Sequence, residues 1–229
     1  MTLTPEETTA LLLSLKVASV ATLGSLPFGI AIAWLLARRE FPGKALLDAA
    51  VHLPLILPPV VTGYLLLLLF GRKGPLGAFL AEHFGIVFAF RWTGAALACA
   101  VMGFPLLVRA VRLSMEAVDT KLEAAAGTLG APPWLVFLTV TLPLSLPGIL
   151  AGAVLSFARA FGEFGATITF VSNIPGETQT LPTAIYSFIQ TPDGDEQAIR
   201  LTLISIAIAV TALILSEWLA RRMAKRVLG

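Results

Sequence analysis

The chain has 229 residues and a formal net charge of +2; 57% of its residues are hydrophobic and only 13% are charged. Soluble domains are about half apolar and about a quarter charged, so this composition indicates a membrane protein. The basic residues lie at the boundaries of apolar segments and form no continuous patch, which argues against nucleic-acid binding. The single cysteine, Cys99, excludes a disulfide framework and a thiolate metal site.

Five windows are long enough to cross a hydrocarbon core, which takes about 20 residues of helix. We therefore predict an all-α fold, a polytopic transmembrane helical bundle of about five spans, built as a single domain over residues 1–229. The first window is too long for a cleavable signal peptide, and Glu6 and Glu7 precede it. The windows cover residues 11–37, 45–70, 92–113, 136–158 and 198–220.

The basic residues predict the orientation of the chain, because cytoplasmic loops carry an excess of Lys and Arg. The richer side is expected to be cytoplasmic, which places the N-terminus outside and the C-terminus in the cytoplasm. The richer side holds Arg38, Arg39, Lys44, Arg109, Arg112, Lys121, Arg221, Arg222, Lys225 and Arg226, and the other side holds Lys16, Arg72, Lys73, Arg91 and Arg200.

Prolines interrupt four of the five windows, and each is expected to bend or break its helix by removing a backbone donor. An isolated proline such as Pro27 or Pro105 is equally compatible with an ordinary membrane helix. Pro54, Pro58 and Pro59 lie too close together for a straight helix, so we predict a broken second span near a pathway or a moving element.

Residues 160–196 are too polar and too rich in glycine for a full span, which favours a re-entrant segment or a short outer helix. Arg159 and Glu163 lie four residues apart on one predicted helix face and form a candidate intramembrane ion pair. A structural role for this pair is favoured over direct contact with a substrate.

The loop over about residues 114–135 contains a short amphipathic helix, within TKLEAAAGTLGAPPWLVFLTVTLP. Thr120 and Glu123 have the spacing of a capping box, with Asp119 as the alternative cap. Gly130 is placed to end the helix in a left-handed conformation. Such a short helix is marginal in water, which favours docking on another protein, although a corner packed on its own bundle is the alternative. Its apolar stripe is Leu122, Ala125, Ala126 and Leu129.

This loop resembles the signature of the membrane subunits of bacterial binding-protein-dependent ABC importers. That signature is EAA, three residues, G, nine residues and I-x-L-P, and Gly130 and Val140–Pro143 match its second half with valine for isoleucine. Glu123 stands one place early, which leaves its role open. The resemblance implies a type I importer membrane subunit with a cytoplasmic coupling helix that docks on an ATPase. The implied coupling residues are Glu123, Ala124, Ala125, Ala126, Leu129, Gly130 and Pro143.

Further segments resemble the molybdate permeases of this family, above all GEFGATITFVSNIPGETQTLP. The resemblance implies a homodimer in the bacterial inner membrane, two ATPase subunits that bind ATP and Mg, and a periplasmic oxyanion-binding protein. The chain has no phosphate-binding glycine loop, no catalytic constellation and no metal-ligand spacing, so we expect no cofactor on this chain.

A dianion needs polar groups that bind it weakly enough to release it. The alternatives to molybdate as cargo are sulfate, tungstate or another oxyanion. Two other classes of protein compete with the importer hypothesis: a secondary transporter driven by an ion gradient and an intramembrane enzyme. Each hydroxyl is equally compatible with ordinary helix packing. The candidate pathway residues are Thr62, Thr167, Thr169, Ser172 and Asn173.

Overall fold

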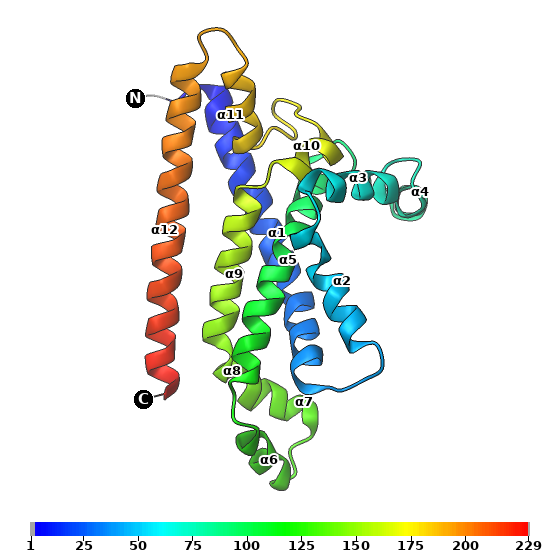
Figure 1. Ribbon diagram of the computed structural model, residues 1–229, viewed down its shortest axis with the longest axis vertical. Helices are drawn as coiled ribbons and strands as arrows, with labels where there is room; N and C mark the ends of the chain where they lie inside the picture. Colours follow the sequence, from blue (N-terminus) through cyan, green and yellow to red (C-terminus); the bar gives the residue numbers. More distant parts are fainter. Residues whose placement is uncertain (1–2, 229) are drawn as a thin grey trace.

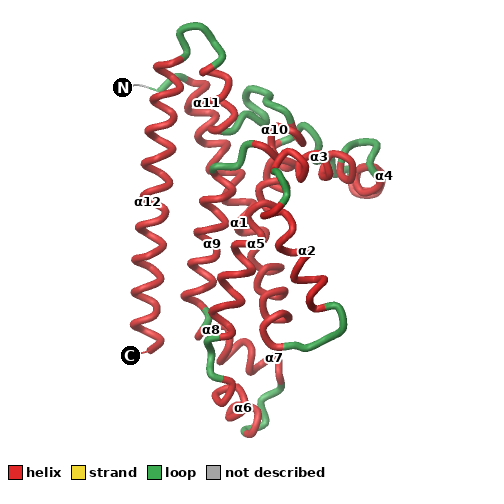
Figure 2. The backbone as a smooth tube through the Cα atoms, viewed as in Figure 1, coloured by secondary structure: helices red, strands yellow, loops and turns green. Residues whose placement is uncertain are grey.

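The computed structural model describes residues 3–228, and after Trp218 it describes only the backbone. The side chains of the basic residues at 221–226, which the orientation prediction uses, lie outside the described residues. Within the described residues all regular secondary structure is helical, which confirms the predicted all-α fold (Figures 1 and 2). The elements are α1 (Pro5–Arg38), α2 (Lys44–Ile56), α3 (Pro59–Phe70), α4 (Pro75–Phe84), α5 (Trp92–Glu116), α6 (Thr120–Thr128), α7 (Pro133–Val136), the π-helical turn η1 (Phe137–Thr141), α8 (Leu142–Leu144), α9 (Leu146–Phe161), α10 (Gly165–Val171), α11 (Leu181–Ile189) and α12 (Asp195–Leu228).

Three helices, α1, α5 and α12, are each long and apolar enough to cross a membrane. Two further pairs pass the same test together but are sharply bent, by 115° between α2 and α3 and by 69° between the α7–α8 segment and α9. The predicted number of about five spans is reached when each bent pair counts as one. The fourth predicted span, 136–158, bends at Ser145 between Pro143 and Pro147, which confirms the predicted proline interruption of this span.

Pro27 and Pro105 do not break their helices, in agreement with the alternative of an ordinary membrane helix. α1 continues through Pro27 and α5 continues through Pro105. Membrane helices tolerate an internal proline when neighbouring helices and local adjustments satisfy the freed backbone groups. Both of these helices pack extensively on others, so the missing donor does not interrupt them.

Helix α5 forms the centre of the bundle and packs most extensively against α1 and α9. The N-terminus lies at one end of the bundle with α10 and α11, whereas α6 lies at the other end, toward which α12 runs (Figures 1 and 2). We call these the N-terminal end and the α6 end. The two ends of the chain therefore lie at opposite ends of the bundle, as an odd number of membrane crossings requires.

Small residues allow the central helices to approach closely, as is usual in membranes, where association depends on packing. A Cβ atom on Gly103 of α5 would lie 2.6 Å from Ser156 Oγ of α9, and one on Gly29 of α1 would lie 2.7 Å from Leu107 Cδ2 of α5. On α5, Ala95, Ala98 and Cys99 are also buried. The close α1–α5–α9 packing thus depends on the absence of larger side chains.

The predicted break in the second span is confirmed. Pro54 lies inside α2, the chain leaves the helix at Leu57, and Pro59 begins α3. After the turn α3 runs across the bundle and carries α4 outward as an arm (Figure 1). The base of the arm is held against α10, because a Cβ on Gly63 would lie 2.5 Å from the carbonyl oxygen of Ala166.

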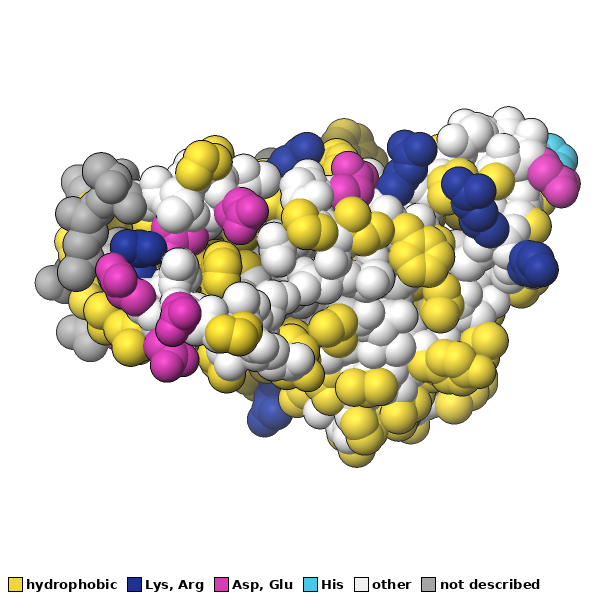
Figure 3. Space-filling view, turned by 90° about the horizontal axis from the view of Figure 1, so that it is seen from above, with side chains coloured by type: hydrophobic (Ala, Val, Ile, Leu, Met, Phe, Trp, Pro, Cys, Tyr) yellow, Lys and Arg dark blue, Asp and Glu magenta, His cyan; other side chains and the backbone are white. Residues whose placement is uncertain are grey.

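The region 160–196 contains two short helices, α10 of seven residues and α11 of nine, both at the N-terminal end. Neither is long enough to cross the membrane. The segment is tied to the bundle, because Leu181 N donates to Ser14 Oγ at 2.6 Å. Seen from this end, acidic side chains gather over the α11–α12 side and basic side chains over the α3–α4 side (Figure 3).

Substitution of Gly63 by alanine tests the α3–α10 contact. The added methyl group must displace backbone of α10, so we expect destabilisation by about 1–3 kcal/mol, the usual cost of overpacking. The measurement is the apparent Tm of the purified protein in detergent. The matched control is Gly24→Ala in α1, where a Cβ meets nothing within 4 Å and the Tm should stay the same or rise. Equal Tm values for both variants would contradict the close contact.

Candidate functional site

The loop helix α6 begins and ends as short helices in water do. Asp119 is its N-cap, and the Asp119 carboxylate accepts a hydrogen bond from Lys121 N at 2.9 Å. The predicted capping box of Thr120 and Glu123 is therefore wrong, because the Glu123 carboxylate points elsewhere. Gly130 has a φ of +89°, which confirms the predicted left-handed end of this segment.

The apolar stripe of α6 is left uncovered. No residue of α6 is buried, and the side chains of Leu122 and Leu129 are 51% and 89% exposed. Ala124 and Ala125 are exposed as well, and Ala126 is half-buried. An ordinary corner would bury such a stripe against its own bundle, so the helix itself is available for docking.

One carboxylate ties α6 to the bundle. Glu123 Oε1 lies 3.0 Å from Arg38 Nη2 at the end of α1, and it accepts a hydrogen bond from Thr141 Oγ1 at 2.6 Å. Arg38 Nη2 also donates to the carbonyl oxygen of Val118 at 3.1 Å. Arg38 and Glu123 are both mostly buried. We call Arg38, Glu123 and Thr141 the α6 bracket.

The α6 bracket connects three elements that a sequence comparison treats separately. Glu123 belongs to the first half of the importer motif and Thr141 to the second half, where it ends the π-helical turn η1 just before Pro143. Turns of π-helix are often found at functional sites. The α6 bracket therefore connects α6 both to the end of α1 and to the π-helical turn. Sequence reasoning missed Arg38, because nothing local links it to a residue 85 positions away.

The five candidate pathway residues lie at the N-terminal end, on α3, α10 and the segment after it. The Thr167 and Thr169 hydroxyls donate to carbonyl oxygens of their own turn, those of Phe164 and Gly165. Thr62 is buried and its hydroxyl has no hydrogen-bond partner. The surroundings of these three threonines fit ordinary helix packing better than a shared anion-binding site. Their role in the pathway stays a prediction.

Ser172 and Asn173 differ from the three threonines. Ser172 is exposed and has a φ of +65°, a conformation that is costly for a residue with a side chain and that is found mostly at functional sites. Asn173 Nδ2 donates to Ser187 Oγ of α11 at 2.6 Å, while Asn173 Oδ1 is buried without a partner. The strained backbone at Ser172 and the unsatisfied amide oxygen of Asn173 indicate that the surrounding structure holds this segment in its conformation.

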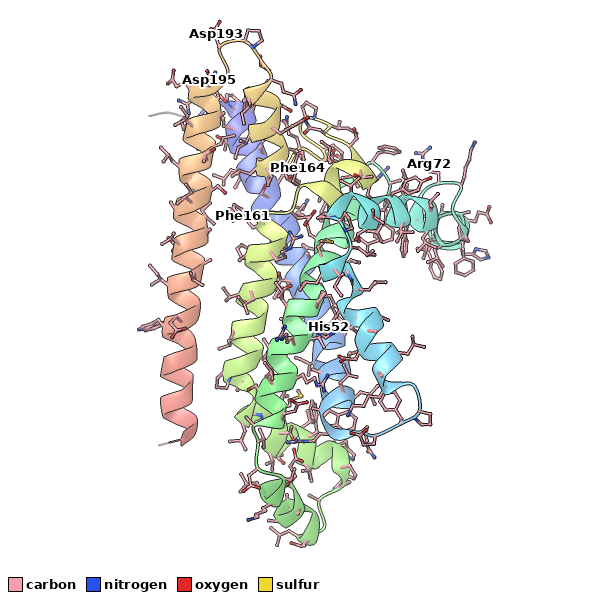
Figure 4. The ribbon with its side chains drawn as sticks, viewed as in Figure 1. His52, Arg72, Phe161, Phe164, Asp193 and Asp195 are labelled. Carbon is pink, nitrogen blue, oxygen red and sulfur yellow. The ribbon has the colours of Figure 1, made fainter. Side chains whose placement is uncertain are left out.

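The predicted intramembrane ion pair is confirmed. Glu163 Oε2 lies 2.5 Å from Arg159 Nη1, and Glu163 Oε1 accepts a hydrogen bond from Ala166 N at 2.8 Å. The pair lies where α9 ends, in the part of the chain that the labels Phe161 and Phe164 mark in Figure 4. The Glu163 side chain is 1% exposed, whereas that of Arg159 is 30% exposed.

The largest cavity described, of about 710 Å³, lies between α1, α2 and α5 and does not contain these polar residues. Its walls are almost wholly apolar, with residues such as Val20, Phe28, Trp92 and Phe104. An oxyanion needs donors to replace its hydration. This cavity is therefore not a site for a charged ligand.

Two further ion pairs hold the bundle together at its ends. Arg200 Nε of α12 lies 2.9 Å from Glu7 Oε1 of α1, and Arg112 Nη1 of α5 lies 3.1 Å from Asp48 Oδ1 of α2. Lys16 Nζ lies 3.6 Å above the centre of the Trp92 ring, toward the N-terminal end of the bundle. Sequence reasoning assigned these basic residues to membrane boundaries only.

Comparison with known families decides the relationship. The family model of the binding-protein-dependent transport system inner membrane component matches residues 25–225. The chain belongs to this family. Its members are permease subunits of ABC transporters, so this chain is a multi-pass inner-membrane permease subunit.

Relatives of known name cover nearly the whole chain. The molybdenum transport system permease protein ModB of Escherichia coli K12 is 66% identical over 221 residues, which are 96% of each chain. The sulfate transport system permease protein CysT of the same strain is 37% identical over 227 residues, which cover 98% of this chain and 80% of that protein. The sequence identity to the molybdenum permease is thus much higher than the identity to the sulfate permease.

A solved structure supports the fold. A bacterial alginate ABC transporter, determined in complex with an alginate pentasaccharide-bound periplasmic protein, aligns with a TM-score of 0.75 over 97% of this chain and 81% of that one. The sequences are 16% identical, so this likeness concerns the fold alone.

Substitution of Glu123 by glutamine tests the α6 bracket. The neutral amide loses the charge that pairs with Arg38, so α6 should open more often. We expect hydrogen-exchange protection of the α6 amides to fall about tenfold, equivalent to roughly 1.4 kcal/mol of local stability. Lys121→Gln is the control, because its exposed side chain lies on the same helix outside the bracket. Unchanged protection in Glu123→Gln would disprove the anchoring role.

Proposed function

We propose that this chain is the transmembrane permease subunit of an ABC importer that moves molybdate into the bacterial cell. The observation that carries the choice of cargo is the 66% identity, over 96% of both chains, to a molybdenum transport permease. The 37% identity to a sulfate permease makes sulfate the less favoured oxyanion. Molybdate and sulfate are both tetrahedral dianions, so a shared bundle suits either and the selectivity belongs chiefly to a binding protein.

Energy for transport would come from outside this chain. The sequence contains no loop of the kind that cradles nucleotide phosphates, so we assign ATP and Mg to two copies of a separate cytoplasmic ATPase. The uncovered stripe on α6 supports this assignment, since Leu129 is 89% exposed and needs a hydrophobic partner. Ala124, Ala125 and Gly130 would lie in the groove of the ATPase, while Glu123 holds the helix to the bundle.

The same assignment orients the chain. The α6 end faces the cytoplasm, where ATP is present, and the N-terminus faces outside together with α10 and α11. The unequally charged N-terminal end would receive a periplasmic oxyanion-binding protein. A second copy of this chain would complete the pathway, as the predicted homodimer requires. Ser172 and Asn173 would then contribute to the outer mouth of the pathway.

Transport of labelled molybdate by the assembled complex tests the function. Proteoliposomes that contain this chain, its ATPase and its binding protein should accumulate molybdate only with ATP. Unlabelled molybdate and tungstate should compete well and sulfate poorly. Uptake by this chain alone along an ion gradient would instead show a secondary transporter, and sulfate uptake that molybdate does not reduce would show a sulfate permease.

Substitution of Gly130 by alanine tests the docking role of α6. Gly130 has a φ of +89°, and alanine in a left-handed conformation costs about 1–2 kcal/mol, so the end of α6 should distort. We expect less ATPase to co-purify with the permease and less uptake per ATP hydrolysed. Gly85→Ala is the control, because Gly85 ends α4 with a φ of +66° far from α6. Equal co-purification in both variants would contradict docking through α6.

A further inference from the structure

We propose that Arg159 and Arg109 are two successive oxyanion-binding positions on one face of the α5–α9 pair, and that Glu163 weakens the first of them. The inference rests on the proposed oxyanion import and names residues that would carry the cargo. It concerns the part of the bundle between the outer threonines and the α6 end.

The contacts between α5 and α9 show which side of each helix faces the other. Cys99 Sγ donates to the carbonyl oxygen of Ala160 at 3.3 Å, and a Cβ on Gly152 would lie 3.2 Å from Ala110 Cβ. Together with the contact of Gly103 and Ser156, these residues define a continuous line of contact along both helices.

Both arginines lie one residue before a member of that line. Arg159 precedes Ala160, and Arg109 precedes Ala110, so each is rotated by about 100° in the same sense about its own axis. Because α5 and α9 run in opposite directions, equal rotations bring both side chains to the same side of the pair. Helix α1 packs on the other side, where Gly29 faces Leu107.

The positions along the bundle suit two steps of one route. Cys99 lies seven residues after Trp92, so Ala160 and its neighbour Arg159 lie about 10 Å below the level of the Lys16–Trp92 contact. Arg109 lies ten residues beyond Cys99, about 15 Å farther toward the α6 end. One arginine is thus in the outer part of the membrane and the other near its inner boundary.

An arginine in a membrane segment almost always faces the interior of a bundle or a water-filled cavity. The Arg159 side chain is 30% exposed, and Arg109 is exposed with no hydrogen-bond or ion-pair partner among the described residues. The open face between α5 and α9 therefore does not face lipid in the assembly. In the proposed homodimer this face lines the space between two copies, and the twofold axis supplies each position twice.

Glu163 gives Arg159 the weak affinity that conduction requires. Ala166 N donates a hydrogen bond to Glu163 Oε1 and fixes the buried carboxylate, while Glu163 Oε2 faces Arg159, so the carboxylate neutralises Arg159 without leaving its place. A guanidinium group has five donors and keeps some of them free beside one carboxylate. An incoming dianion meets these donors and is also repelled by Glu163, so it is bound and then released.

The decisive variant is the neutral pair Arg159→Gln with Glu163→Gln, assembled with the ATPase and the binding protein in proteoliposomes. It removes both charges and keeps hydrogen-bonding side chains of similar size. If the pair binds cargo, uptake of labelled molybdate falls about tenfold or more, as the loss of a charged donor predicts. ATP hydrolysis stimulated by the binding protein should persist. Wild-type uptake by this variant would overturn the proposal.

Arg109 provides the second test, because an exposed side chain without a partner is not required for folding. Arg109→Gln should reduce uptake severalfold, and Arg109→Lys should restore most of it because the charge returns. Lys44→Gln, which removes a basic residue that pairs, among the described residues, only with the exposed Glu40 in the α1–α2 loop, is the matched control and should transport normally. If Arg109→Gln equals this control, the route is wrong even where the neutral pair fails to assemble.

Glu163→Gln alone leaves Arg159 without its counter-charge. The detergent-solubilised complex should then retain more labelled molybdate in the absence of ATP than the wild type does, and its uptake should be slower. Equal or lower retention would contradict the masking role. If the unsubstituted complex does not transport molybdate at all, the proposed function fails and not this inference.

Discussion

Charged side chains within an apolar bundle have to be paired or have to face water, and this constraint organises the whole chain. Glu7 with Arg200 joins the first and last long helices, and Arg112 with Asp48 joins α5 to the broken second span. Glu123 with Arg38 fastens the loop helix. Each pair connects elements that are distant in sequence, so each charge is neutralised only when these helices have packed together.

The bundle consists of a closely packed centre and of peripheral elements that make fewer contacts with it. Helices α1, α5 and α9 pack through small residues and form the centre. Helix α6 lies outside it with its apolar stripe uncovered, yet Arg38 and Thr141 connect it to α1 and to the π-helical turn. Helix α6 thus has an attachment to the bundle and an exposed apolar face at the same time, which are the two features that the proposed docking of an ATPase requires.

The polar groups suitable for a dianion are distributed along the bundle and do not form one pocket. The hydroxyls of α10 are mostly used within their own helix turns, and the cavity between α1, α2 and α5 is apolar. The proposed anion-binding groups are therefore Arg159 in the outer part of the α5–α9 pair and Arg109 nearer the α6 end. The antiparallel course of these two helices, which the close contacts at Gly103 and Gly152 maintain, brings the two arginines to one side.

Local signals in the sequence predicted the spans and the loop helix, but not α4 or the π-helical turn η1. Hydrophobic length predicted the spans, the prolines at 54, 58 and 59 predicted the break, and Gly130 predicted the end of the loop helix. The spacing of Arg159 and Glu163 predicted their pair, because both lie on one helix face. The sequence left the effect of Pro27 and Pro105 open, since neighbouring helices decide whether a proline interrupts a helix, and both helices continue. Only the tertiary structure decided the partner of Glu123 and the shared face of Arg159 and Arg109, because both depend on how helices distant in sequence pack together, and no local pattern encodes that packing.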